Sequence, residues 1–322
     1  MRLDRFVREE HSEGVKISAR VEWEGAHRGP EVMWFESDRR HAEGFDAAPE
    51  AFLLAAMPLA AGLGEPRLRI EGRACARLRD GLSAVMTTFA TWYPWCRRVP
   101  IEASEGFASL SPRTPARVGA FFSGGVDSLS MVVANLRDHG PDDPARVHEA
   151  FHLFGWHSDD FDGRSPRAER VRVFEERHAR LVTFAERAGL VLTPVRTNVR
   201  TFHPSFPWSR DVGFGPGMIA AAHAFRARVS AVLFASGGYP GAMPPHASHP
   251  DLDSLFSSGA LAASHAEPDH TRLDKVIAIA SRPEAMSVLE VCLHHDVPAP
   301  GTLALLAAGL AALGGMRSRR TA

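Results

Sequence analysis

The sequence predicts an α/β fold in which a smaller N-terminal α+β domain precedes a doubly wound parallel sheet. From Val118 onward, short apolar runs alternate with longer helical segments, which is the pattern of βα units on a parallel sheet. Residues 15–104 form a separate set of strand-like and helix-like stretches, and the Ser- and Pro-bearing segment 109–117 separates the two patterns as a linker. A chain of 322 residues is long enough for two domains.

We therefore place an N-terminal domain at residues 1–110, a larger domain at 116–292 and an apolar tail with a basic end at 293–322. In the larger domain we expect strands at residues 118–122, 148–156, 190–197 and 230–236, with a weaker one at 287–292. Helices are expected at residues 127–137, 167–188, 216–228 and 271–280. The N-terminal domain should alternate between strand-like and helix-like stretches at residues 15–23, 31–37, 51–63, 68–72, 78–92 and 99–104.

Composition narrows the class of protein. With 45% hydrophobic and 23% charged residues, the chain has the make-up of an ordinary globular protein. Its net charge of -1 provides no positive field for nucleic acid, so a polynucleotide partner is disfavoured. The three cysteines, Cys75, Cys96 and Cys292, are too far apart for a disulfide framework. Because the first residues also lack the apolar run of a secretory signal, we expect a cytoplasmic location.

One motif carries chemistry. The strand at 118–122 runs directly into the sequence SGGVDS, residues 123–128, and then into a helix. The glycine pair lets the backbone approach a phosphate closely, and the helix N-terminus offers unpaired N–H groups. Ser123 and Ser128 add hydroxyl donors, while Asp127 can bind Mg²⁺. The motif is neither a Walker A loop nor the G-x-G-x-x-G of dinucleotide folds.

This motif closely resembles the SGGxDS pyrophosphate loop of the PP-loop (N-type) ATP pyrophosphatases, which include asparagine synthetase and 7-cyano-7-deazaguanine synthase. The resemblance implies an adenine nucleotide alpha hydrolase-like fold. In that family the loop grips the β and γ phosphates while a substrate oxygen attacks the α phosphorus and pyrophosphate leaves. The resemblance implies that pyrophosphate and magnesium are bound by the loop residues Ser123, Gly124, Gly125, Val126, Asp127 and Ser128.

The wider chain, including the segment TWYP at residues 91–94, resembles a less characterised branch of the same superfamily over most of residues 30–292. That branch carries a cysteine cluster for zinc near its C-terminus, whereas Cys292 stands alone here, so we predict no structural zinc. The missing cluster puts the C-terminal closure of the site in doubt.

Further site candidates lie where the later strands end, because ligands of open parallel sheets bind beyond the carboxyl ends of the strands. After the second strand, where the family places adenine and ribose contacts, come Phe154, Gly155 and Trp156, followed by His157 and the acidic residues Asp159, Asp160 and Asp162. A solvated acidic loop is the alternative. The third and fourth strands end at Asn198 and Ser236, which we predict to neighbour the substrate or the α phosphate.

Two cations and a histidine-rich loop complete the candidates. Arg272 and Lys275 open a helix from which they could neutralise developing phosphate charge, although an exposed helix face would explain them equally well. The loop that contains His246, His249 and Asp251 concentrates ligand-type side chains. We predict that it binds the substrate, with a divalent metal site as the alternative.

The function that follows is an ATP-dependent ligase that forms AMP and pyrophosphate. It would activate a small carboxylate or carbonyl compound as an adenylate for attack by a nitrogen nucleophile, with ATP and Mg²⁺ as cofactors. Residue 2 is Arg and not the Cys of N-terminal nucleophile amidotransferases, so ammonia or a substrate amine is the expected nucleophile. We assign catalytic roles to Asp127, Ser128, Arg272 and Lys275. The alternative is a nucleotide-binding module without turnover, regulatory or scaffold-like. The partner is a small molecule, and a homodimer is compatible with either function.

The end of the chain has a different character. An apolar stretch follows Val297 and precedes the basic residues Arg317, Arg319 and Arg320, and the whole resembles a PEP-CTERM sorting tail. Its apolar part, residues 301–316, is shorter than the roughly 20 residues that span a bilayer. We therefore expect a packed terminal helix in preference to a membrane anchor.

Overall fold

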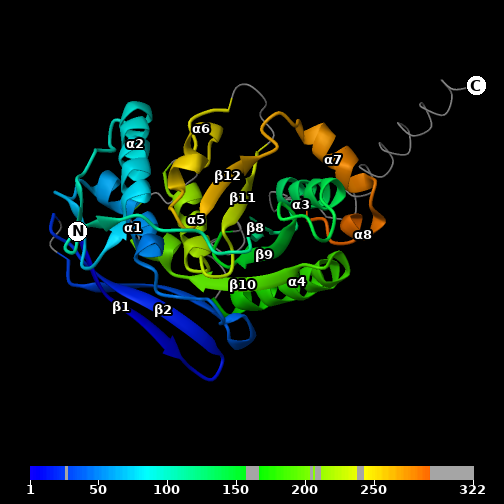
Figure 1. Ribbon diagram of the computed structural model, residues 1–322, viewed down its shortest axis with the longest axis horizontal. Coiled ribbons are helices and arrows are strands. Elements are labelled where there is room, and N and C mark those ends of the chain that lie inside the picture. The colour runs from blue at the N-terminus through cyan, green and yellow to red at the C-terminus, as the bar shows by residue number, and fades with distance from the viewer. Residues whose placement is uncertain (26–27, 157–166, 204–205, 207–211, 238–242, 291–322) are drawn as a thin grey trace, which may run out of the picture.

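The computed structural model describes residues 1–25, 28–156, 167–203, 206, 212–237 and 243–290. It is a mixed α/β structure with a large, mostly parallel central sheet (Figure 1). Ten strands form this sheet in the order β12-β11-β8-β9-β10-β3-β2-β1-β4-β6, and β5 pairs with β7 in a small second sheet. The sheet thus runs across the predicted domain boundary, and the division into domains stays a prediction.

Five strands of the larger predicted domain lie side by side and all parallel: β12 (Ala262–Ala266), β11 (Ala231–Ala235), β8 (Val118–Phe121), β9 (Val147–Leu153) and β10 (Val191–Thr197). Four of them confirm the strands expected from the sequence. The fifth expected strand, at residues 287–292, is wrong over its described part, because residues 287–289 form no strand and Glu290 makes only an isolated bridge with Gly125. The edge position belongs to β12, whose sequence AASHA lacks the β-branched and aromatic residues typical of strands.

Helices cover both faces of these parallel strands. Successive residues of a strand point to opposite faces. Ala120 and Phe122 belong to one apolar cluster with α3 (Val126–Asp138), α4 (Arg167–Ala188) and α7 (Arg272–Ala280). Phe121 belongs to another cluster, together with α5 (Phe214–His223) and α1 (Pro49–Leu63). The helices expected at 127–137, 167–188 and 271–280 are therefore confirmed to within a residue at each end, and the one expected at 216–228 is α5, which begins two residues earlier and ends five residues earlier.

The N-terminal part extends the sheet. β1 (Arg2–Glu10), β2 (Gly14–Glu22) and β3 (Glu31–Asp38) form an antiparallel meander, and β4 (Leu68–Ile70) and β6 (Ile101–Ala103) continue it in parallel beside β1. The sequence pattern missed β1, because most of its second half is exposed and charged. The remaining elements are η1 (Arg39–His41), β5 (Ala74–Cys75), α2 (Ala76–Trp92), β7 (Phe107–Ala108), η3 (Val199–Thr201), α6 (Pro250–Asp253), η4 (Ser254–Phe256) and α8 (Pro283–Met286).

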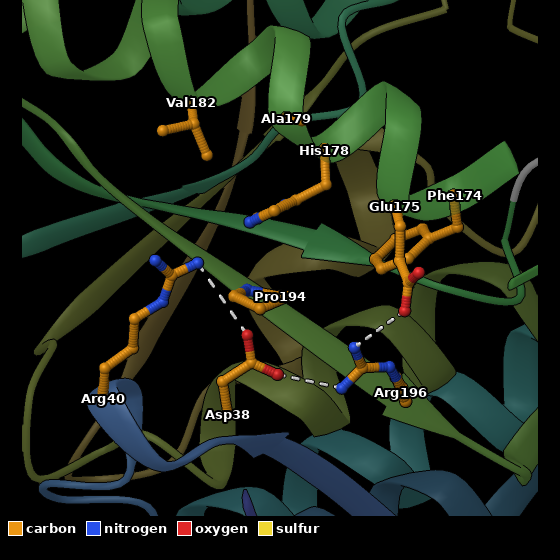
Figure 2. A pocket seen from close by; sticks show the side chains of 9 residues that line it. All are labelled: Asp38, Arg40, Phe174, Glu175, His178, Ala179, Val182, Pro194 and Arg196. Atoms are coloured by element: carbon orange, nitrogen blue, oxygen red, sulfur yellow. Dashed lines mark hydrogen bonds and ion pairs between the residues drawn. The ribbon is translucent and has the colours of Figure 1, made fainter. Parts of the chain in front are cut away.

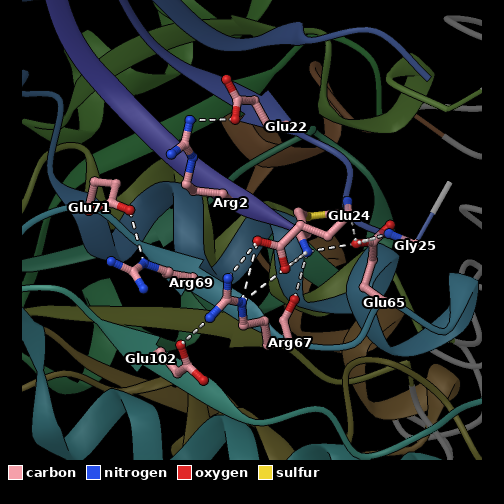
Figure 3. Close-up of polar contacts among 10 residues, drawn as sticks. Arg2, Glu22, Glu24, Gly25, Glu65, Arg67, Arg69, Glu71 and Glu102 are labelled. Atoms are coloured by element: carbon pink, nitrogen blue, oxygen red, sulfur yellow. Dashed lines mark hydrogen bonds and ion pairs between the residues drawn. The ribbon is translucent and has the colours of Figure 1, made fainter. Parts of the chain in front are cut away.

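A buried charge joins the start of β1 to the end of α1 (Figure 3). The amino group of Met1 donates to Glu65 Oε2 at 2.6 Å and to the Arg67 carbonyl oxygen at 2.8 Å. The same Glu65 oxygen accepts the backbone N–H groups of Glu24 and Gly25 at 2.9 and 3.0 Å. Because a buried ion is stable only when it is paired and hydrogen-bonded, this cluster fixes the end of α1 against the start of β1.

Gly81 lies where α2 packs closely against η4, so its replacement tests this packing. A Cβ at this position would lie 1.9 Å from the Leu255 carbonyl oxygen, which is far inside van der Waals contact. We expect Gly81→Ala to lower the free energy of unfolding by about 1–3 kcal/mol, since overpacking displaces the backbone. Urea denaturation measures this. Gly140→Ala is the control because a Cβ there meets nothing within 4 Å, and equal stability of the two variants would contradict the packing described here.

Candidate phosphate-binding site

The loop that follows β8 requires a glycine. Gly124 has a φ of +77°, in the left-handed region that side chains other than glycine rarely adopt. A Cβ there would also lie 2.8 Å from Leu181 Cδ2 and 3.2 Å from the Val288 carbonyl oxygen. Gly125, with a φ of -70°, has ordinary backbone geometry. The glycine pair therefore has one residue that is essential to the shape of the loop and one that is not.

The two hydroxyls of the motif close the loop on itself. Ser128 Oγ accepts the backbone N–H of Ser123 at 3.2 Å and donates to the Gly125 carbonyl oxygen at 3.2 Å. Ser123 Oγ lies 3.2 Å from Ser128 Oγ and accepts the backbone N–H of Gly125 at 3.3 Å. These contacts are long for hydrogen bonds that involve hydroxyl groups, so a phosphate oxygen could displace them at small cost.

Backbone donors gather at the same place. α3 begins at Val126, and the first N–H groups of a helix have no partner within the helix. In the part of the chain that the structure describes, no acceptor is found for the backbone N–H groups of Gly124 and Asp127, whereas the bridge between Gly125 and Glu290 pairs the N–H of Val126 with the Glu290 carbonyl oxygen. Unpaired N–H groups at the positive end of a helix form an anion site. The arrangement thus suits a phosphate, as the sequence predicts.

Both predicted cations reach this loop from α7. Arg272 Nη1 donates to Asp127 Oδ2 at 3.0 Å, and Lys275 Nζ donates to Asp127 Oδ1 at 3.1 Å. Lys275 is fully buried and also donates to the carbonyl oxygen of Ser236 at the end of β11. Arg272 Nη2 donates to the carbonyl oxygen of Gly237 at 3.2 Å. Tertiary structure therefore brings the loop, the end of β11 and the two cations together.

A buried carboxylate that no sequence motif indicates lies beside Lys275. Glu267 follows β12, and its side chain is only 9% exposed. Its Oε1 accepts the Ser130 hydroxyl at 3.1 Å and lies 3.4 Å from His270 Nδ1, while its Oε2 lies 4.0 Å from Lys275 Nζ. Burial raises the pKa of this carboxyl even though Lys275 opposes the shift. Glu267 also has a φ of +54°, a strained conformation that is common at functional sites.

The predicted adenine contacts lie at the end of β9. The backbone N–H of Phe154 donates to the Val195 carbonyl oxygen at 2.8 Å, and Gly155 has a φ of +97°. Arg200 Nη1 donates to the Trp156 carbonyl oxygen at 3.3 Å, and its guanidinium lies 6.0 Å from the centre of the Trp156 ring. Their role toward a nucleotide stays a prediction. The residues that follow, His157, Asp159, Asp160 and Asp162, lie outside the described residues.

The side chain of Asn198, at the end of β10, is hydrogen-bonded to the backbone of β3. Its Oδ1 accepts the backbone N–H of Trp34 at 2.9 Å, and its Nδ2 donates to the Val32 carbonyl oxygen at 2.8 Å. Both partners belong to β3, so the side chain fastens β3 to the end of β10. Any contact of Asn198 with an α phosphate, as expected from the sequence, would have to compete with these two bonds.

The histidine-rich loop is largely occupied with its own structure. His249 Nδ1 accepts the backbone N–H of Asp251 at 3.1 Å and caps α6, while its ring packs 5.3 Å from that of Trp92. Asp251 projects into solvent with 81% of its side chain exposed. The ring of His246 packs 5.7 Å from Phe214. Nowhere among the described residues do three or more His, Cys, Asp or Glu side chains come together to hold a metal.

A second buried acid–base pair lies under this loop. His265 Nδ1 donates to Asp253 Oδ2 at 2.8 Å, with side-chain exposures of 4% and 0%. The Ser248 hydroxyl donates to the same carboxylate at 2.9 Å, and the backbone N–H of His249 does so at 3.2 Å. His265 and Asp253 come from different elements of the fold, so sequence spacing offered no signal for the pair. Its effect is to hold α6 against β12.

A cavity of about 440 Å³ lies away from the loop, between α4, β10 and η1 (Figure 2). Arg196 Nη1 pairs with Asp38 Oδ1 at 2.9 Å across its floor, and Arg40 and Glu175 carry the other charges. The pKa of His178, at its wall, is lowered to about 4, mainly by burial and then by Arg40. None of the predicted site residues lines this cavity.

Comparisons with known proteins bear on the end of the chain. A protein-family model, the PEP-CTERM protein-sorting motif, matches residues 296–320. This match confirms the resemblance seen in the tail, while the packed terminal helix expected there lies outside the described residues. No curated protein and no solved structure matches the chain.

The sorting motif overturns the expected cytoplasmic location. A PEP-CTERM motif is a C-terminal sorting signal for export toward the cell envelope, so the cytoplasmic assignment is wrong. That assignment rested on the few cysteines and on the absence of an apolar run in the first residues, neither of which reports on a signal at the other end. None of the helices within the described ranges combines the length and apolar character that spanning a bilayer requires.

The glycine pair offers a matched test of the loop geometry. We expect Gly124→Ala to lower the free energy of unfolding by about 1–3 kcal/mol, because the residue is left-handed and its Cβ would meet Leu181 and Val288. Gly125→Ala is the control, since its φ is ordinary and its nearest neighbour would be Ser123 Oγ at 3.3 Å. Chemical denaturation of both variants measures the difference, and a Gly125 variant that is the less stable of the two would refute the assignment.

Proposed function

We propose that the chain is an ATP-dependent enzyme of the PP-loop type, which cleaves ATP between its α and β phosphates and forms an adenylate. One observation carries the proposal. The SGGVDS loop, the N-terminus of α3 and the two cations of α7 converge at the carboxyl ends of β8 and β11. No single element supplies this combination of backbone donors, hydroxyls and positive charge.

The topology supports the same proposal. In chain order the five parallel strands lie as fifth, fourth, first, second and third, and helices pack on both faces. We interpret this part as a doubly wound sheet, whose strand order reverses on either side of β8. Ligands of such sheets bind at the carboxyl ends next to the reversal point. The SGGVDS loop follows β8 and so occupies that point.

The residues fit a polyphosphate and a magnesium ion. The free N–H groups around the start of α3, with Ser123 and Ser128, would bind the β and γ phosphate oxygens. Arg272 and Lys275 would stabilise the negative charge that grows on the departing pyrophosphate. Asp127, which now accepts hydrogen bonds from both cations, would bind Mg²⁺, and the ion would supply further charge neutralisation to the phosphates.

The placement of the cations supports cleavage at the α phosphorus. A P-loop lysine lies within its loop beside the phosphate to be transferred, whereas this loop continues as Val126, Asp127 and Ser128. Its lysine comes from α7, where the ammonium group of Lys275 is buried behind Asp127. Such a pocket suits the retention of a leaving pyrophosphate better than the transfer of a γ phosphoryl group.

The second half of the reaction concerns the activated substrate. We propose that a small carboxylate or carbonyl compound accepts the adenylyl group and that a nitrogen nucleophile then displaces AMP. Of the predicted substrate residues, both histidines also serve the structure of their own loop, because His246 Nδ1 accepts the backbone N–H of Ser248 at 3.0 Å and His249 caps α6, while Asp251 faces solvent. The sorting motif defines where the chain is sent and leaves the reaction open, because it lies outside the residues that form the site.

Replacement of Asp127 tests the site directly. We expect Asp127→Asn to reduce ATP turnover by about 10²–10³-fold, since it removes the ligand for Mg²⁺ and the charge partner of both cations. Asp138→Asn, at the other end of the same helix, is the control because, within the described part of the chain, its side chain makes only an exposed pair with Arg137. Magnesium-dependent pyrophosphate release is measured with a panel of carboxylates and ammonia. Full activity of the Asp127 variant would exclude the proposed site.

The nucleotide products provide a second test. We expect AMP and pyrophosphate, because the loop is arranged to hold the two terminal phosphates together as one leaving group. Anion-exchange chromatography of a reaction mixture separates AMP from ADP. Accumulation of ADP would show that the γ phosphate is the one attacked, and would overturn the mechanism.

A further inference from the structure

The last described residues of the chain lie against the phosphate loop. The backbone N–H of Glu290 donates to the Gly124 carbonyl oxygen at 2.9 Å, and Glu290 forms a parallel bridge with Gly125. Val288 lies so close that its carbonyl oxygen would meet a Cβ on Gly124 at 3.2 Å. A segment far from the loop in sequence therefore forms one wall of it.

The side chain of Glu290 is fixed as firmly as its backbone. Its Oε2 accepts Arg177 Nε at 2.6 Å, and its Oε1 accepts a hydrogen bond from Arg180. These arginines, three positions apart, share one face of α4, and Arg177 is only 5% exposed. Leu181 of the same helix packs beside Gly124. The carboxylate thus ties the end of the chain to the helix that supports the loop.

These contacts act on the part of the loop that a phosphate would use. The Gly124 carbonyl oxygen is occupied by the N–H of Glu290 and would not repel an anion, while the Asp127 N–H at the start of α3 stays available as a donor. Anion sites of this kind depend on donors that are held in place before the ligand arrives, because reorganising them on binding costs free energy. The Glu290 contact is the one external backbone hydrogen bond that the described residues make to Gly124.

We propose that Glu290 is a positioning residue for the phosphate loop. Its backbone N–H and its carboxylate together fasten Gly124 and Gly125 to α4, and so hold the loop in the conformation that accepts pyrophosphate. The inference rests on the proposed function only for the identity of the ligand. The claim that Glu290 restrains the loop depends only on its hydrogen bonds to Gly124, Arg177 and Arg180.

The test uses the whole chain with three test substitutions, one control substitution and two measurements. Glu290→Gln removes the charge, and Glu290→Asp keeps a carboxylate. Arg180→Gln removes the more exposed arginine and leaves the contact between Arg177 and Glu290. Glu284→Gln is the control, because it lies in α8 and faces Arg282 at 3.9 Å, away from the loop. Hydrogen exchange of residues 123–128 reports on the loop, and calorimetry with inorganic pyrophosphate and Mg²⁺ reports on the ligand.

We expect faster exchange of the loop in Glu290→Gln and Arg180→Gln, with pyrophosphate affinity reduced about tenfold in Glu290→Gln, as is typical for the loss of a charged hydrogen bond. Glu290→Asp should recover most of that affinity, a rescue that a purely structural role would not require. If Glu290→Gln does not fold, Arg180→Gln carries the test alone, because that side chain is mostly exposed.

The outcomes separate the two proposals. Loop exchange and affinity equal to those of the wild type in Glu290→Gln or, failing that, in Arg180→Gln, would overturn the positioning role. Equal changes in the Glu284 control would overturn it as well, since the effect would not be specific to the loop. A wild-type protein that binds no pyrophosphate, but whose loop exchanges faster when Glu290 is replaced, would sustain the restraint and refute the proposed function.

Discussion

The buried ammonium group of Lys275 is the constraint on which the candidate site depends. An ammonium group without water is stable only when anionic or carbonyl oxygens surround it. Here Asp127 lies at 3.1 Å and Glu267 at 4.0 Å, and the carbonyl oxygen of Ser236 completes the set. These partners come from the start of α3, the segment after β12 and the end of β11. Because all of them must meet at one nitrogen, the docking of α7 also determines where the loop after β8 lies.

Two helices thus support the loop from different directions. α7 supplies positive charge on the side of Asp127, and α4 supplies Leu181 and the arginines that bind Glu290 on the side of Gly124. The backbone N–H groups of Gly124 and Asp127 between them are left without partners in the described part of the chain. Free donors at a helix N-terminus beside the buried Lys275 and the half-exposed Arg272 are an arrangement in which proteins bind anions, and this supports the proposed phosphate site.

The sorting motif lies close in sequence to the residue that supports the phosphate loop. It begins at residue 296, shortly after Glu290, and Glu290 is hydrogen-bonded to the loop that would bind the nucleotide. The signal for export and the candidate site therefore meet at neighbouring positions of the chain, although they serve different purposes. The first is read as a linear sequence, whereas the second exists only in the folded protein. This difference explains why the tail was recognisable from its residues while the support that Glu290 gives the loop was not.

By itself, the sequence determined what depends on local pattern. It determined β8, β9, β10 and β11, the helices α3, α4, α5 and α7, and the SGGVDS turn, because apolar periodicity and glycine act over a few residues. It also placed Arg272 and Lys275 at the start of α7. Tertiary structure alone decided what depends on distant partners. It made AASHA a strand by pairing it with β11, left residues 287–289 outside the sheet, and buried Glu267 beside Lys275. It also engaged Asn198 and His249 in structural bonds. Burial and hydrogen-bond partners are properties of the packed chain, and no local pattern encodes them.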